Sequence, residues 1–463
     1  MTPRAALAAG LLAGAAFAAG PAAAADLVET YRAAQQADPD LAVARASLRT
    51  GEARRALAGT LWKPSVVASG AAGVAGNDTR TRGASFSAPG FGDQTGVAFR
   101  TSVTAGPSLR WSVAARQPLL DRGRDAQVRQ LELASDAAAL EWQAAQQALM
   151  LRTAQRYLDV ALAQESVRVL GGQRDAALRA LAEARDRYAL GDAPVTGTHE
   201  AQARAQAVAA QLLAAESELE VRRAALADLT GGAPDARPVR IPGAARPAGA
   251  TGTLEEATAR VARDNLSLRM LAIDVDVARA QAVQFTRAAA PSADLVAQVA
   301  REQLSGHGDY GAAGSSATTT MIGVQLSVPL YTGGQRDARL DEATRVAEKA
   351  AAQLESARRQ AVRDARAAWH GLAAGEGRIA ALEAALDASR ARLAATQLGR
   401  DVGDRTTLDL LNAQNDLAQA DLALSQARAA RVLDALRLAA LESRLDEDAL
   451  RRVDATLAQA PGR

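Results

Sequence analysis

The sequence predicts a mainly α-helical protein with a small β part, built from a helix–strand–strand–helix–helix repeat used twice. The first observation is an internal duplication: QPLLDRG around Pro118 is similar to VPLYTGG around Pro329. LGDAPVTG around Gly191 is in turn similar to VGDRTTLD around Gly403. The two members of each pair are 211 and 212 residues apart, so the distance between the two motifs is nearly the same in both copies. Such a repeat indicates one structural plan used twice.

Composition is the second observation. Alanine is the commonest residue and aromatic residues make up only 3% of the chain, although 48% is hydrophobic. Alanine favours helices, and its small side chain lets helices pack closely, so thin helical layers are expected instead of a thick core. The formal net charge is +2 and the only lysines are Lys63 and Lys349. The chain has no run of positively charged residues of the kind that would indicate a nucleic-acid partner.

The N-terminus has the pattern of a signal peptide over residues 1–25. Arg4 is followed by the apolar stretch 5–19 and by Ala23-x-Ala25, a small-residue cleavage motif. The chain has no cysteine, which excludes disulfides and a lipid-anchoring cysteine. After residue 25 no apolar run reaches about 18 residues, so no transmembrane helix is expected. Strands would have to hold the protein in a membrane.

The first repeat is predicted to span residues 26–230. A helix over 27–61, interrupted near Pro39, precedes strands at about 65–76 and 101–118, with a loop between them. A helical hairpin then covers 121–229. Its first helix is expected to be continuous and about 100 Å long, with a bend or loosened packing at Gly171–Gly172, a full break there being the alternative.

The second repeat is predicted to span 254–446, after a Pro/Gly-rich linker at 231–253. One helix is expected over 254–289, followed by strands at about 293–302 and 319–330 and a helical hairpin at 336–445. Residues 447–463 are expected to be a polar C-terminal tail.

The strands explain why oligomerisation is expected. Leu109, Trp111 and Val113 alternate with polar residues, as do Ile322 and Val324, which predicts strands with one apolar face. Four strands per chain cannot close a membrane barrel, which needs about eight, and open edges are not tolerated in lipid. Three copies would supply twelve strands around a channel, whereas two would leave a filled lumen, so three is favoured.

These features together resemble the TolC-type outer-membrane efflux and type I secretion family. The similarity rests on the duplicated order, the P-L-x-x-G-G motif and the V-G-x-x-T-x-x-D-L-L-x-A-Q turn, and it covers about residues 26–446. It implies a homotrimer in the outer membrane with a 12-stranded transmembrane β-barrel and a long α-helical barrel in the periplasm. The implied function is the passive exit duct of a tripartite efflux or type I secretion system. The implied partners are a periplasmic adaptor, or membrane fusion, protein and an inner-membrane ABC or proton-driven transporter.

The resemblance places the two hairpin turns at the periplasmic tip, where the channel closes. The family's lock pairs an Arg in the second turn with an Asp in the first turn of a neighbour. Arg405 matches the Arg, but Gly197 replaces the Asp, and Arg400 replaces the family's tip tyrosine. Asp192, Asp404 or Glu200 is therefore the expected anion. The predicted tip residues are Gly191, Asp192, Thr196, Arg400, Gly403, Asp404, Arg405, Asp409 and Leu411.

Simpler roles remain open for these residues. Asp404 is expected to cap the following helix, because an Asp there can accept free backbone N–H groups. Asp409 matches the family's constricting aspartate ring but could equally be a solvated helix charge. Asn412 stands where a second acid would follow, which would weaken a cation site. The strand-to-helix junction is assigned to Pro118, Gly123, Pro329, Gly333 and Gly334.

An enzymatic function is not expected. The histidines His199, His307 and His370 are far apart and lack acidic or cysteine partners at ligand spacing, so neither a metal nor another cofactor is predicted. The alternative to a duct is a soluble periplasmic coiled-coil adaptor or scaffold. An adaptor would have one helical hairpin and a lipoyl-like β-domain, whereas this chain repeats its strands.

Overall fold

The computed structural model describes most of the chain. Two predicted regions, the signal peptide and most of the linker, lie outside the described residues. Within the described residues, no helix is long and apolar enough to cross a membrane. The described residues are 26–90, 92–191, 194–232, 239–240, 252–287, 291–308, 311–456 and 458–459.

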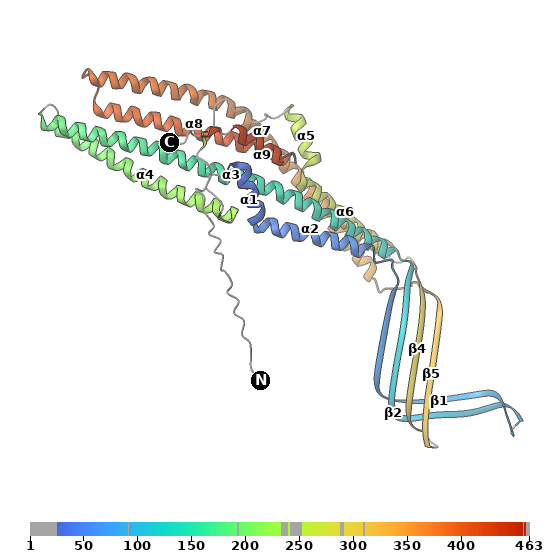
Figure 1. Ribbon diagram of the computed structural model, residues 1–463. Helices are drawn as coiled ribbons and strands as arrows, with labels where there is room; N and C mark the ends of the chain where they lie inside the picture. Colours follow the sequence, from blue (N-terminus) through green and yellow to red (C-terminus); the bar gives the residue numbers. More distant parts are fainter. Residues whose placement is uncertain are drawn as a thin grey trace, which may run out of the picture. The chain divides into compact units, whose positions relative to one another are not determined.

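The secondary structure follows the predicted repeat (Figure 1). The helices are α1 (Leu27–Ala37), α2 (Pro39–Ala58), α3 (Arg122–Ala189), α4 (Val195–Thr230), α5 (Leu254–Asp264), α6 (Leu266–Arg287), α7 (Gln335–Asp401), α8 (Thr407–Leu441) and α9 (Glu447–Thr456). The strands are β1 (Ser65–Ala88), β2 (Gly92–Leu120), β3 (Val239–Arg240), β4 (Ser292–Gly308), β5 (Gly311–Ser327) and β6 (Ala458–Gln459).

The chain forms two compact units. One contains most of the helical hairpins together with α1, α5, α9 and the start of α2. The other contains the four-stranded sheet and the helix segments next to it. The first comprises residues 1–46, 140–269 and 356–463, and the second comprises 47–139 and 270–355.

Each repeat begins with a broken helix. Asp38 separates α1 from α2, and its carboxylate accepts the N–H of Leu41 at 2.7 Å. Asn265 separates α5 from α6 in the same way, with its Oδ1 accepting the N–H of Leu268 at 3.1 Å. The first break agrees with the interruption predicted at Pro39. The single helix predicted over 254–289 is wrong, because Asn265 starts a new helix by capping it.

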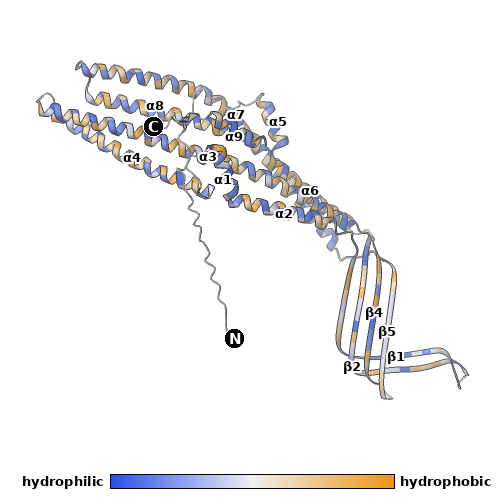
Figure 2. Ribbon diagram, in the orientation of Figure 1, coloured by the Kyte–Doolittle hydropathy of each residue, from blue (hydrophilic) through white to orange (hydrophobic). Residues whose placement is uncertain are grey.

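The two long helices are continuous. α3 has 68 residues and α7 has 67, and α3 passes through Gly171 and Gly172 without a break. Apolar and polar residues are mixed along both (Figure 2). The largest core of the helical unit joins α1, α3, α4, α8 and α9; its largest fully buried side chains include Leu27, Tyr31, Leu149, Tyr157, Leu158, Leu226, Val432 and Leu450.

The sheet is antiparallel throughout, in the order β1-β2-β4-β5. Residues directly opposite in neighbouring strands share a face. The register therefore collects apolar side chains on one face; they are Val66, Leu109, Trp111, Val113, Leu295, Ile322, Val324 and Leu326. The opposite face has polar pairs, such as Arg110 with Glu302 at 2.8 Å and Ser69 with Ser112 at 2.8 Å. The prediction of one apolar and one polar face is confirmed.

The strands are longer than predicted. β1 continues to Ala88 and β2 starts at Gly92, so most of the expected loop at 77–99 is a ribbon. In the second repeat, β4 reaches Gly308 and β5 starts at Gly311 but ends at Ser327, before Pro329. The Gly-, Ser- and Thr-rich sequence of these added strand segments lacks the alternation of apolar and polar residues that predicts a strand. Pairing across the ribbon nevertheless satisfies its backbone groups, which overrides weak local preference.

The polar tail predicted at 447–463 is wrong for its first ten residues. They form α9, in which Leu450 is fully buried and Val453 is 3% exposed. Asp454 accepts the backbone N–H of Leu27 at 3.1 Å, and Arg32 pairs with Glu447 at 2.6 Å. The C-terminal helix is therefore part of the helical core, packed on α1.

Candidate functional site: the two helical hairpin turns

The turn between α7 and α8 depends on a left-handed glycine. Gly403 has φ of 85°, a conformation that side chains disfavour. It lets the chain reverse so that the N–H groups of Asp404 and Arg405 both donate to the carbonyl of Gly399, at 2.8 and 3.2 Å. The last carbonyls of α7 are thereby satisfied, as in glycine-ended helices generally.

A capping box at Thr406 starts α8. The Thr406 hydroxyl accepts the N–H of Asp409 at 3.1 Å, while the Asp409 carboxylate accepts the N–H of Thr406 at 3.0 Å and its hydroxyl at 2.9 Å. These hydrogen bonds, helped by the positive charge of Arg405, lower the pKa of Asp409 below its usual value. The expectation that Asp404 caps this helix is wrong, because Thr406 occupies the N-cap position.

Arg400 joins the two hairpins of the chain. Its Nη1 lies 3.1 Å from the Oε2 of Glu183 on α3, and its Nη2 lies 3.2 Å from the Oδ1 of Asp401. The Arg400 side chain is 21% exposed and that of Glu183 is 40% exposed. Glu183 was not among the anions expected from the sequence; it lies on α3 itself, six residues before its last residue Ala189, and not in the turn that follows.

Arg405 differs from Arg400 in being exposed. Its side chain lies against Gly399, where a Cβ would come within 2.8 Å of the Arg405 Cγ. Within the part of the chain that the structure describes, neither Arg405 nor Asp404 has a side-chain hydrogen bond or ion pair.

The turn between α3 and α4 also uses a left-handed glycine. Gly191 has φ of 79°, and its N–H donates to the carbonyl of Tyr188 at 2.9 Å. Thr196 lies in the first turn of α4, whose N-cap, Pro194, makes no side-chain hydrogen bond. Asp192 lies outside the described residues. This turn thus lacks the polar box that begins α8.

Close to these turns, α8 packs on both α3 and α4. Leu411 is 4% exposed in a small cluster with Ala177, Ala180, Leu181, Ala184, Ala201 and Ala205. Polar contacts continue the same interface. Arg204 on α4 donates to Asn415 at 2.6 Å, and Arg168 on α3 lies 3.1 Å from Asp421. Leu411 is therefore a packing residue between the hairpins.

Both turns present apolar side chains to solvent. Leu190 is 84% exposed beside Gly191, and Leu398 and Val402 are 67% and 73% exposed near Gly403. Isolated exposed apolar residues are common, but here they occur at the same place in both repeats.

The junction residues lie where strands and helices meet. Pro118 is in β2 at a register shift, and Asp121 accepts the N–H of Gly123 at 2.9 Å, which starts α3. Pro329 follows the end of β5, and Gly333 and Gly334 have positive φ angles of 62° and 80° just before α7. The duplicated motif thus marks the same junction twice, although only the second copy needs left-handed glycines.

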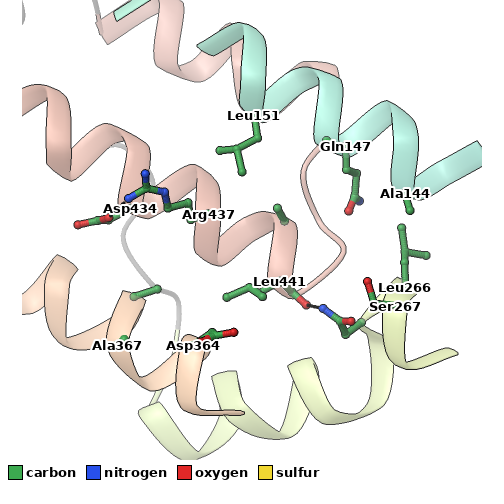
Figure 3. A pocket seen from close by; sticks show the side chains of 14 residues that line it. Ala144, Gln147, Leu151, Leu266, Ser267, Asp364, Ala367, Asp434, Arg437 and Leu441 are labelled. Atoms are coloured by element: carbon green, nitrogen blue, oxygen red, sulfur yellow. Dashed lines mark hydrogen bonds and ion pairs between the residues drawn. The ribbon is translucent and has the colours of Figure 1, made fainter. Parts of the chain in front are cut away.

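A separate pocket of about 550 Å³ lies among α3, α6, α7 and α8 (Figure 3). Its wall is mostly alanine and leucine, with Asp434 and Arg437 paired at 3.1 Å. Asn265 closes one side by donating to the carbonyl of Leu441 at 2.9 Å. None of the lining residues is a histidine or cysteine. In the described residues, no cluster of His, Asp and Glu could hold a metal ion.

The fold is similar to those of solved outer-membrane channels. The outer membrane protein VceC from Vibrio cholerae matches with a TM-score of 0.69 and 20% identity, over 91% of this chain and 97% of its own. The CmeC channel of Campylobacter jejuni matches with a TM-score of 0.70 and 15% identity, over 93% and 90%.

The sequence itself matches the family model described as outer membrane efflux protein, over residues 30–232 and 259–442. The chain belongs to the outer membrane efflux protein family. Members of this family are transport proteins of the outer membrane, and the two matched segments correspond to the two predicted repeats, the first running two residues past the predicted end at 230.

Two relatives indicate the range of this family. Outer membrane protein TolC of Vibrio cholerae is 31% identical over 68% of this chain and 72% of its own length. The proteases secretion protein PrtF of Dickeya chrysanthemi is 26% identical over 76% of each. The efflux protein is thus similar both to TolC proteins and to a protein named for secretion.

Proposed function

We propose that three copies of this efflux protein assemble into one continuous exit duct across the outer membrane and the periplasm. The sheet carries the proposal: its four strands have one apolar face, and β1 and β5 are its two edges. Membrane barrels need about eight strands, and lipid does not tolerate an open edge. Three chains supply twelve strands, with the apolar face toward lipid and the polar face toward the lumen.

The partners we propose are a periplasmic adaptor and an inner-membrane transporter of the ABC or proton-driven class. The exposed Leu190, Leu398 and Val402 give both hairpin turns an apolar surface for the adaptor. Similarity to a proteases secretion protein supports polypeptide cargo. The duct itself has no catalytic role.

We propose that the pair Arg400–Glu183 helps to hold the tip closed. It ties the end of α7 to α3, so outward rotation of the second hairpin must break it. Arg405 is free to meet an acid of a neighbouring chain, since Gly197 does not supply one. Asp409, fixed in its capping box, contributes negative charge at the same end of α8.

A soluble adaptor or scaffold is not favoured. Such a protein would need one helical hairpin and a separate β-domain, whereas this chain has two hairpins and a sheet whose β-hairpins each join two helices.

Membrane fractionation and planar-bilayer recording test the proposed function. We expect the protein in the outer-membrane fraction, and we expect the purified oligomer to form channels that are mostly closed at rest. Recovery only from the periplasm, with no conductance, would contradict the duct.

A further inference from the structure

One part of the sheet extends well beyond its neighbours. The register between β2 and β4 ends at Ser108 and Leu304. Farther out, 77–88 of β1 and 92–103 of β2 pair with each other. We call these two segments the outer arm. At about 3.3 Å per residue, its twelve-residue strands are roughly 40 Å long.

The outer arm is amphipathic. Thr81 lies opposite Phe99, and Ala84 lies opposite Val97. Two register shifts, between Thr81 and Ala84 and between Ala84 and Phe86, fall on opposite strands and compensate each other, so that Phe86 shares a face with Val97 and Phe99. The opposite face is charged; there Arg100 donates two hydrogen bonds to Asp78, at 2.9 and 2.8 Å, and Arg80 lies 3.7 Å from the same carboxylate.

A bulge at the base decides which way the apolar face points. Between the pairs Ala75–Gly106 and Asn77–Val103, β2 has one extra residue. β1 runs through this point in phase, so the face of Asn77 and Val103 continues the polar face of the sheet. The outer arm therefore carries its apolar side chains on the side that faces the lumen in the proposed barrel.

Burial at the base shows that the outer arm bends toward this same face. Val103 is 2% exposed and Leu304 is 4% exposed, although most of the sheet is open to solvent. By register, both point to the polar face. A side chain on Gly106 would overlap the backbone of Ser305, so the chains approach closely there. Figure 1 shows β1 and β2 turning sharply beyond the ends of β4 and β5.

We propose that the outer arms of three copies meet over the outer mouth of the duct, apolar face to apolar face, and narrow it. This inference rests on the proposed trimer, in which symmetry brings the same face of each copy toward one axis. A two-stranded ribbon alone is only marginally stable in water. Phe86 and Phe99 are nevertheless 46% and 49% exposed in the single chain. Contact between copies covers them and leaves the arginines outside.

Cysteine cross-linking tests the contact, because the natural chain has no cysteine. Phe99→Cys places a thiol on the apolar face, and Arg100→Cys places the matched control one residue away on the charged face. In isolated outer membranes, a short bis-maleimide reagent should link Phe99→Cys chains into dimers and leave Arg100→Cys chains monomeric on denaturing gels. Equal linking of both variants, or of neither, would overturn the proposal.

A second measurement asks whether the outer arm narrows the duct. In the Arg400→Ala channel, in which we expect the periplasmic tip to be open, replacing residues 77–103 with an Asn-Gly turn, which favours a tight hairpin, should raise single-channel conductance several-fold. If this shortened chain does not assemble, the pair Phe86→Ser and Phe99→Ser should raise conductance in its place. Unchanged conductance overturns the proposal.

Two further outcomes separate the outer arm from the duct itself. A bimane on Phe99→Cys that is quenched by nitroxide lipids would show that the apolar face lies on the membrane, which overturns the contact but leaves the trimer intact. If the unmodified chain is not a trimer by native mass spectrometry, the proposed function fails and this inference fails with it.

Discussion

At the residue scale, two arginines near the second turn have different roles. Arg400 is mostly buried against Glu183 of the same chain, whereas Arg405 is exposed and lies over Gly399. The first ties the end of α7 to α3 within one subunit, whereas the second acts within the described part of its own chain only through its charge on Asp409. A missing acid at Gly197 therefore does not leave the tip without a charged contact.

Arg400→Ala should increase the resting conductance of the channel in planar bilayers. The pair is partly exposed, so its loss costs only about 0–1 kcal/mol, which shifts the closed population without unfolding the tip. Arg390→Ala is the matched control, because Arg390 pairs with Asp387 on its own helix. The charge swap Arg400→Glu with Glu183→Arg should restore closure. A swap that leaks as much as Arg400→Ala would argue against the contact.

Thr406→Ala should destabilise the start of α8 by about 1 kcal/mol, because it removes one half of a capping box. Hydrogen exchange of the first turn of α8 should become faster, while that of α7 should stay the same. Thr396→Ala is a suitable control, since its hydroxyl bonds only to Arg392 within α7. Unchanged exchange in α8 would show that the box adds nothing.

The capping box also makes the stability of the first turn of α8 depend on pH. Because the folded pKa of Asp409 lies below its unfolded value, its stabilising effect is fully present above the unfolded pKa. The effect is lost as pH falls through the lower, folded pKa. Exchange of the first turn of α8 should therefore be insensitive to the ionisation of Asp409 at neutral pH and should speed up only in strong acid, and Asp409→Asn should remove that acid response.

At the element scale, the turn after α8 is held by hydrogen bonds and an ion pair to the α5–α6 region of the helical unit. Ser443, after α8, has φ of 57° and accepts the N–H of Leu266 at 3.1 Å. The nearby Glu442 is 7% exposed and pairs with Arg260 at 2.8 Å. These contacts join the end of α8 to α5 and to the start of α6. The helices of the second repeat are therefore held together by polar contacts as well as by apolar packing.

Leu450→Ala in α9 should lower stability by about 2–5 kcal/mol, because it leaves a cavity in a fully buried site. Arg452→Ala, at an exposed position of the same helix, should have little effect. Thermal unfolding in detergent, followed by circular dichroism, measures both. Equal midpoints for the two variants would mean that α9 does not belong to the core in solution.

Val324→Lys in β5 should reduce assembly, because a lysine on the lipid face of a membrane barrel is destabilising, by up to about 2–4 kcal/mol at the bilayer midplane. Gln325→Lys, one residue away on the polar face, should assemble normally. The yield of heat-resistant oligomer on gels compares them. Assembly of the Val324 variant with failure of the Gln325 variant would show that the faces are reversed.

At the scale of the whole molecule, the duplication and the sheet together predict the number of subunits. Each chain brings two β-hairpins, and twelve strands require three chains. Native mass spectrometry of the detergent-extracted protein should therefore give the mass of three copies. A stable dimer would leave eight strands and a lumen filled with side chains, which is inconsistent with a duct.

Sequence patterns were enough to predict the repeat, the long helices, the two-faced strands and the turns at Gly191 and Gly403. Each of these depends on local periodicity or on backbone conformations that few residues allow. Arg400 lies near the end of α7, but the sequence could not supply Glu183 as its partner. The capping box between Thr406 and Asp409 was also missed, although the T-x-x-D spacing could have revealed it.

The outer arm and the helix α9 depend instead on contacts between segments that are distant in the chain. The outer arm has little strand pattern of its own, and it is held by pairing between segments whose register depends on bulges. The helix α9 is too short to be stable alone and exists because α1 covers it. Contacts between distant segments are hard to predict from local sequence, because the apolar surface or backbone hydrogen bonds of one segment are satisfied only when the other segment is in place.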